Sequence, residues 1–168
     1  MVDDDEDVHA ITKIALRSLR YKGRSLQILE ARSSAEALQI LRVTPGVAVI
    51  LLDVVMESSE AGLRACQIIR QQHENHFVRI ILRTGQPGMA PEESVVRDYE
   101  IDGYLPKVEA TSARLVTMVR TALKAYEEIT DIEAKRRSLE SVHETVRDLS
   151  GTSAWSAFRS DAMGQVEE

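Results

Sequence analysis

The chain of 168 residues is long enough for one compact domain and an extension. Hydrophobic residues make up 43% and charged residues 29% of it, which excludes a disordered or fibrous protein, and the single cysteine excludes an intramolecular disulfide. The net charge of −6, without a basic patch, disfavours direct nucleic-acid binding. No stretch approaches the ~20 apolar residues that cross a bilayer, and the acidic start is unlike a signal peptide. We therefore expect a cytoplasmic protein with no membrane partner.

Helical segments alternate with short apolar strands in the expected secondary structure. The apolar run 47–52, bounded by turn residues, is typical of a strand that is covered on both faces. In chain order we expect a helix at 8–20, a strand at 26–31, a helix at 35–41, a strand at 47–52, a helix at 62–73, a strand at 78–82, a helix from about 91, a strand at 102–105 and a last helix from 112. This alternation predicts a parallel sheet with helices on both faces.

Polar residues follow the expected strands at the edge where such folds bind ligands. Asp53 ends the most apolar strand, Thr84 follows the next, and Lys107 follows the last. The acidic run Asp3–Asp7 comes directly after Val2, which would end a first strand. Carboxylates, a hydroxyl and an amine are thus expected at one rim.

That set of groups suits a carboxylate that accepts a phosphoryl group. Asp4 and Asp53 offer the oxygen ligands that Mg²⁺ prefers, and the cation would neutralise the acceptor and the incoming phosphoryl oxygens. Lys107 offers a fixed point charge for another phosphoryl oxygen. The Thr84 hydroxyl is small enough to move toward the phosphoryl group.

The motifs resemble the receiver domain of two-component response regulators. They occur in the family's order over about 105 residues, at Val2–Asp5, Leu51–Met56, Arg83–Gly85 and Tyr104–Lys107. The resemblance implies an α/β fold with a doubly wound, parallel five-stranded sheet (flavodoxin-like, order 2-1-3-4-5). It also implies an output face formed by the fourth helix, the fifth strand and the fifth helix. The subset of receivers that it resembles carries a C-terminal helical arm before larger output domains.

The resemblance also implies a role for each matching residue. Asp53 would accept a phosphoryl group from a sensor histidine kinase or a phosphotransfer protein, and Lys107 would contact that group. The switch residues would be Thr84 and Tyr104. The magnesium ligands implied are Asp3, Asp4, Asp53 and the carbonyl of Val55.

Two loops depart from the family pattern. Glu57 stands where the family usually has proline, and Gly62 comes one residue late, so the loop after the acceptor is longer. Glu57 either reaches a magnesium-bound water, lowers the reactivity of the acceptor by adding negative charge, or is a solvated loop acid. Pro106 precedes Lys107 instead of following it, and because a non-proline cis bond costs about 2.5–4 kcal/mol, we expect a trans bond from Lys107 to Val108.

The first strand is largely missing, because only Met1 and Val2 precede Asp3. It should lie in the middle of the sheet, where the loss of several buried apolar residues forfeits about 7–15 kcal/mol. That is as large as the whole stability of a typical domain, about 5–15 kcal/mol. We therefore predict that a segment upstream in the gene, another segment or another chain fills the gap.

A long helical arm is expected at the C-terminal end, since residues 112–149 contain no proline or glycine. One apolar stripe would pack on the receiver, and a second, at Leu139, Val142, Val146 and Leu149, has near-heptad spacing that predicts coiled-coil pairing in a homodimer. The expected domains are a receiver at 1–125, a helical signalling arm at 126–150, and a tail or truncated output segment at 151–168.

The function predicted is that of a phosphorelay response regulator that is not itself an enzyme and that transmits its switch through the last helix. A hydrolase of the haloacid-dehalogenase type also uses a strand-end aspartate with Mg²⁺, but it needs a second aspartate two residues later, where Val55 stands. The other alternative is a degenerate receiver that serves as a dimerisation or adaptor module without phosphorylation.

Overall fold

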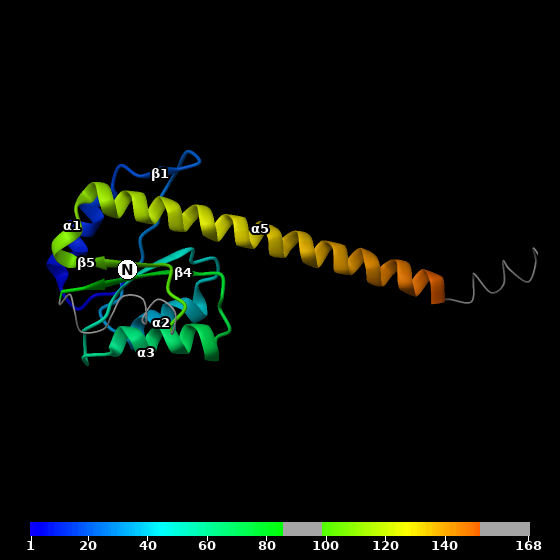
Figure 1. Ribbon diagram of the computed structural model, residues 1–168, viewed down its shortest axis with the longest axis horizontal. Helices are drawn as coiled ribbons and strands as arrows, with labels where there is room; N and C mark the ends of the chain where they lie inside the picture. The colour runs from blue at the N-terminus through cyan, green and yellow to red at the C-terminus, as the bar shows by residue number, and fades with distance from the viewer. Residues whose placement is uncertain (86–98, 152–168) are drawn as a thin grey trace, which may run out of the picture. The chain divides into compact units, whose positions relative to one another are not determined.

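Three parallel strands form the centre of the computed structural model, which describes residues 1–85 and 99–151, with side chains as far as residue 147. The strands are β3 (Val49–Asp53), β4 (Arg79–Thr84) and β5 (Gly103–Pro106), in the order β3-β4-β5 (Figure 1). Leu52 lies opposite Leu82, which in turn lies opposite Tyr104. The carboxyl ends of all three strands therefore meet at one edge.

The first strand is reduced to a single residue beside β3. The amide of Val2 donates to the Leu51 carbonyl at 2.8 Å, and the Asp53 amide donates to the Val2 carbonyl at 2.9 Å. On its other side Val2 is bridged to Ala31, also in parallel. The order 2-1-3-4-5 and the doubly wound α/β fold are thus confirmed, as is the near absence of the first strand.

The expected strand at 26–31 is reduced to its last residue. Only Ala31 makes a bridge, while the chain ahead of it forms a small antiparallel hairpin of β1 (Arg20–Tyr21) and β2 (Arg24–Ser25). The physical reason lies in the neighbouring first strand. Because that strand begins at Met1, residues 26–30 have too little of a partner for a regular ladder.

Helices cover both faces of the sheet (Figure 1). Ser33 caps one of them by accepting a hydrogen bond from the Glu36 amide, as its sequence position predicts. No membrane-spanning helix occurs within the described ranges, and the expected helix near 91 lies outside the described residues. The helical elements are α1 (Glu6–Leu16), α2 (Ser34–Val43), α3 (Ala61–Gln67), the π-helical turn η1 (Ile68–Gln72), the 3-10 turn η2 (Lys107–Glu109) and α5 (Ser112–Gly151).

Alternate residues of the strands supply two hydrophobic cores. Even-numbered residues such as Leu52 and Leu82 pack with α2 and α3, and odd-numbered ones such as Leu51, Ile81 and Leu105 pack with α1 and the start of α5. The α5 side chains in this second core are Leu115, Val119 and Ala122, which confirms the first apolar stripe.

The chain divides into two units, with the boundary between Glu128 and Ile129 inside α5. In the second unit four large apolar residues are exposed by 56–71%. They are Ile132, Leu139, Val142 and Val146.

Two cavities lie where the missing part of the first strand would run. One of about 450 Å³ opens between the segments 24–29 and 44–49, and one of about 40 Å³ lies toward α2 and α3. Met1, Leu29 and Val49 are among the residues that line both. The Met1 amine donates to the Leu29 carbonyl at 2.6 Å, as a backbone amide would in a sheet. Burial lowers the pKa of this amine to about 6. The filling of this gap stays a prediction.

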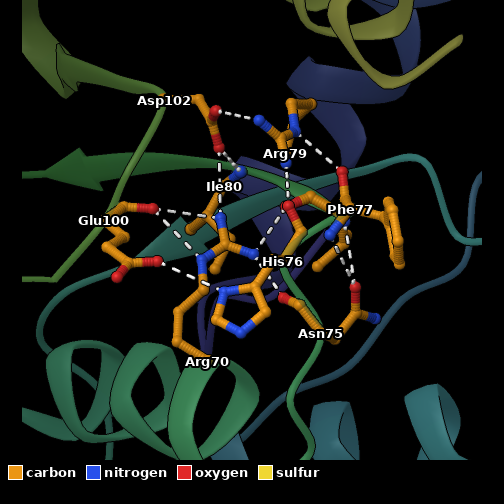
Figure 2. Close-up of polar contacts among 9 residues, drawn as sticks. Arg70, Asn75, His76, Phe77, Arg79, Ile80, Glu100 and Asp102 are labelled. Atoms are coloured by element: carbon orange, nitrogen blue, oxygen red, sulfur yellow. Dashed lines mark hydrogen bonds and ion pairs between the residues drawn. The ribbon is translucent and has the colours of Figure 1, made fainter. Parts of the chain in front are cut away.

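At the amino end of β4, the buried side chain of Arg70 joins separate loops (Figure 2). Its Nη1 donates to the carbonyls of Asn75 at 2.6 Å and Val78 at 2.8 Å. Its Nε and Nη2 donate to the Glu100 carbonyl at 3.2 and 3.0 Å, and Nη2 also reaches Asp102 Oδ2 at 3.2 Å. All five N–H groups of this guanidinium are therefore used.

Asp102 completes the same network (Figure 2). It accepts from the Ile80 amide at 2.7 Å and from Nη1 of Arg79 at 2.8 Å. The network thereby ties the turn before β4 to the segment that enters β5. It fixes the sheet at the end opposite the acidic rim.

Candidate functional site

Asp53 lies at the carboxyl end of β3 and is 3% exposed. Its Oδ1 accepts from the amide of Val54 at 2.9 Å, and its Oδ2 lies 2.8 Å from Nζ of Lys107. Burial raises the pKa of this carboxyl, and Lys107 opposes the rise. The side chain is thus held in one orientation beside a fixed cation.

Asp3 lies next to Asp53 because Val2 is paired with β3, and it is 1% exposed. Its Oδ2 lies 3.1 Å from Nζ of Lys107 but has no hydrogen-bond partner within the described part of the chain. Its Oδ1 accepts from the Asp5 amide at 3.1 Å. One buried carboxylate oxygen of Asp3 is therefore left for a further ligand.

The carboxylates of Asp3, Asp4 and Asp53 form one cluster. Each offers an oxygen, and these oxygens lie within 4.8 Å of one another. Asp4 is exposed, whereas the other two are buried, so an ion could enter from the side of Asp4. Oxygen ligands at this spacing, with one of them unpartnered, fit a hard divalent cation of the magnesium type.

The loop after Asp53 is held close to the acceptor by Gly62. The Gly62 amide donates to the Val54 carbonyl at 3.1 Å. A Cβ on this glycine would lie only 2.0 Å from the backbone oxygen of Asp53, so no other residue fits without a shift. The start of α3, which closes the loop, therefore needs glycine here, although it comes one residue late. Val55 lies in this loop with its side chain 37% exposed.

Lys107 reaches the acids from the 3-10 turn that follows β5, where the Ala110 amide donates to the Lys107 carbonyl at 3.3 Å. Its peptide bond to Val108 is trans, as predicted. Burial alone would lower the pKa of this amine, but the hydrogen bonds to Asp53 and Asp3 outweigh it and raise the pKa. Lys107 is therefore a cation throughout the neutral range.

Thr84 and Tyr104 lie near one another on adjacent strands. Thr84 is buried at the carboxyl end of β4, opposite Pro106 of β5. Tyr104 is half-buried and packs on the core that faces α2 and α3. Their switch roles stay predictions, and the fourth helix of the expected output face lies outside the described residues.

Glu57 is an exposed acid in the loop after Asp53, and the structure adds a partner for it. Its carboxylate accepts hydrogen bonds from the amide of Ser34, at 3.1 Å, and from the Ser34 hydroxyl. It therefore sits at the amino end of α2, where the helix dipole favours negative charge. Desolvation would raise the pKa of Glu57, but the bonds from Ser34 lower it below its ordinary value.

Sequence patterns gave no role to two buried polar residues beside the site. Arg83, which is 6% exposed, donates from Nη1 to the Thr12 hydroxyl at 2.8 Å. His9 is also buried, with Nε2 2.7 Å from the Asp3 carbonyl oxygen. The available signal for Arg83 was a charged residue at the end of an otherwise apolar strand.

Comparison with known proteins agrees with this geometry. The profile of the response regulator receiver domain family matches residues 1–120. A curated relative, the 3'3'-cGAMP-specific phosphodiesterase 2 of Vibrio cholerae, is 36% identical over 166 residues, which are 99% of this chain and 32% of that protein. The chain thus spans about a third of the length of the curated relative that it matches.

Solved structures show the same fold. The signal receiver domain of an HD domain-containing protein from Pseudomonas fluorescens is similar with a TM-score of 0.64 and 25% identity, over 77% of this chain and 88% of that one. The structure described as adenylate cyclase from Rhodopirellula baltica gives a TM-score of 0.67 at 20% identity, over 81% and 93%. A CheY-like receiver from Methanospirillum hungatei gives 0.60 at 20% identity, over 76% and 93%. From the family match and the strand-end aspartate with its lysine, we conclude that the chain belongs to the response regulator receiver domain family.

Proposed function

We propose that this chain is a phosphorelay switch that takes a phosphoryl group from a histidine kinase or phosphotransfer protein onto Asp53. The observation that supports it most is the Asp53 carboxylate itself, 2.8 Å from the Lys107 amine and clustered with Asp3 and Asp4. A buried carboxylate without such partners would be a poor acceptor, because its charge would be unstable.

The chemistry follows from the positions of these groups. An Asp53 oxygen attacks the phosphorus of a phosphohistidine, a P–O bond forms, and the P–N bond breaks as the imidazole leaves. Mg²⁺ held by Asp3, Asp4, Asp53 and the Val55 carbonyl would supply neutralising charge for the phosphoryl oxygens. Lys107 already contacts Asp53 and can contact a phosphoryl oxygen after a small movement.

The output is proposed to run through Thr84, Tyr104 and α5. A phosphoryl group adds about −1.5 to −2 charge, which draws the Thr84 hydroxyl inward and repositions Tyr104. We keep the proposed division into a receiver at 1–125, an arm at 126–150 and a tail or output segment at 151–168. In this proposal the chain is a regulatory cytoplasmic segment without enzymatic activity of its own.

Phosphorylation is tested by incubating the protein with acetyl phosphate and Mg²⁺ and measuring its intact mass. We expect the mass gain of one phosphoryl group in the wild-type protein and in Asp131→Asn, a control in the arm. Asp53→Asn, which keeps the shape of the side chain, should show none. Absence of a gain in the wild-type protein would favour the alternative, an adaptor module that works without phosphorylation.

Pairing through the arm is the second part of the proposal. The exposed side chains Leu139, Val142 and Val146 recur at the three- and four-residue spacing of a coiled-coil seam. A charge at Val142 should therefore shift the protein from dimer to monomer in sedimentation analysis. The control is Val43→Glu, which alters an exposed valine at the end of α2. An unchanged mass for Val142→Glu would contradict pairing along this seam.

A further inference from the structure

Arg83 and Asp53 lie side by side at the carboxyl ends of adjacent strands, as partners in the β3–β4 register. Asp53 comes two residues after Leu51, and Arg83 comes two residues after Ile81. Both Leu51 and Ile81 belong to the core that faces α1 and α5. Because side chains alternate along a strand, Arg83 and Asp53 project to that same face. The bond from Arg83 to Thr12 of α1 agrees with this direction.

Arg83 is buried, but one of its guanidinium nitrogens makes no hydrogen bond to the described residues. It is 6% exposed, and its Nε has no hydrogen-bond partner in the part of the chain that the structure describes. Arg70, which is 5% exposed, uses all of its N–H groups on loop carbonyls and Asp102. A buried donor without a partner costs free energy. Unlike Arg70, Arg83 is therefore not explained by hydrogen bonds that hold loops together.

With Arg83 included, the positive charges of Lys107 and Arg83 equal in number the negative charges of the two buried carboxylates, Asp3 and Asp53. Oδ2 of each buried carboxylate lies 2.8–3.1 Å from Nζ of Lys107, and Arg83 is the register partner of Asp53. The exposed Asp4 adds one further negative charge. Burial lowers the pKa of Arg83, and the two carboxylates act against that change, so they lie within electrostatic reach of the guanidinium. Arginine nevertheless stays charged at any ordinary pH.

We propose that Arg83 is a second fixed cation of the acidic site, which weakens divalent-cation binding and strengthens the hold on the phosphoryl group of Asp53. The effect on the phosphoryl group rests on the proposed function, whereas the effect on metal binding does not. A positive charge repels an incoming metal ion and attracts an incoming anion. It therefore acts in opposite directions on the two ligands, whereas damage to the fold would weaken both.

The test measures Mg²⁺ binding by calorimetry, and then beryllofluoride binding at saturating Mg²⁺, in the full chain. In Arg83→Met we expect Mg²⁺ to bind roughly 5- to 30-fold more tightly, and beryllofluoride roughly 3- to 10-fold more weakly, from the loss of one charge at this range. Arg83→Lys keeps the charge and should restore both affinities toward the wild-type values. Arg83→Gln is the second neutral variant, and it carries the comparison if Arg83→Met does not fold.

Arg70→Met is the matched control, because it removes a similarly buried arginine at the opposite end of the sheet from the acidic site. It should lower stability and leave both affinities unchanged. Weaker binding of both ligands in folded Arg83→Met or Arg83→Gln, or no change in either, would overturn the proposal. If the wild-type protein binds Mg²⁺ but no beryllofluoride, the proposed function fails, and the Mg²⁺ affinities still decide whether Arg83 acts as a charge on the metal site.

Discussion

The two ends of the sheet hold buried charges in different ways. At the amino end of β4, Arg70 and Asp102 saturate one another and the surrounding backbone (Figure 2). At the carboxyl end, within the described residues, Oδ2 of Asp3 has an ion pair with Lys107 but no hydrogen bond, and Nε of Arg83 has no hydrogen-bond partner. Buried polar atoms without a hydrogen-bond partner cost stability. Within the described residues they occur at the carboxyl end, which indicates that this end binds ligands.

The largest expected effect on stability comes from the gap beside β3, where the first strand is short. A short run of valine and isoleucine placed before Met1 could enter the cavities beside Leu29 and Val49. Two or three added apolar residues should raise the free energy of unfolding by about 3–9 kcal/mol. Guanidinium unfolding measures this, with a glycine and serine extension as control. Equal stability of the two extended proteins would show that the gap does not take a strand.

Removing the saturated arginine should have the next largest effect. Arg70→Met removes the guanidinium donors to the carbonyls of Asn75, Val78 and Glu100 and one of the donors to Asp102. Because Asp102 is partly exposed and keeps Arg79, we expect a loss of about 2–4 kcal/mol in the free energy of unfolding. Urea unfolding measures it. A loss below about 1 kcal/mol would mean that water replaces the network readily.

The pH dependence of stability gives the smallest expected effect. Burial raises the pKa of Asp53 in the folded protein above its ordinary value of 3.8. The folded state then holds the proton more tightly, so this group lowers stability as the pH rises from about that value through the folded pKa. Compared with Asp53→Asn, the wild-type protein should lose stability over this window in urea unfolding. A relative gain with rising pH would show that Lys107 outweighs burial.

The rim of functional groups could be predicted from the sequence because it depends on order along the chain. Parallel strands bring Asp53, Thr84 and Lys107 to one edge whatever the details of their loops, and the alternation of strands and helices is visible in the apolar pattern. The trans bond after Lys107 followed from the energy of a cis bond alone. These features need only local chemistry and the topology of the fold.

Features that depend on a distant partner could not be predicted. The segment 26–31 has strand-like residues, but the neighbour needed for a ladder begins only at Met1. Glu57 finds Ser34 because the acceptor loop passes the amino end of α2, which no spacing in the sequence reveals. Arg83 looks like a strand-end surface residue until α1 covers it with Thr12.

The site of phosphorylation tests the central claim most directly. After reaction with acetyl phosphate and Mg²⁺, borohydride reduction converts a phosphorylated aspartate to homoserine, and peptide mass spectrometry then identifies the altered residue. The account predicts a single modified position, Asp53. Modification at Asp3 or Asp4, or at none of the three carboxylates, would contradict it.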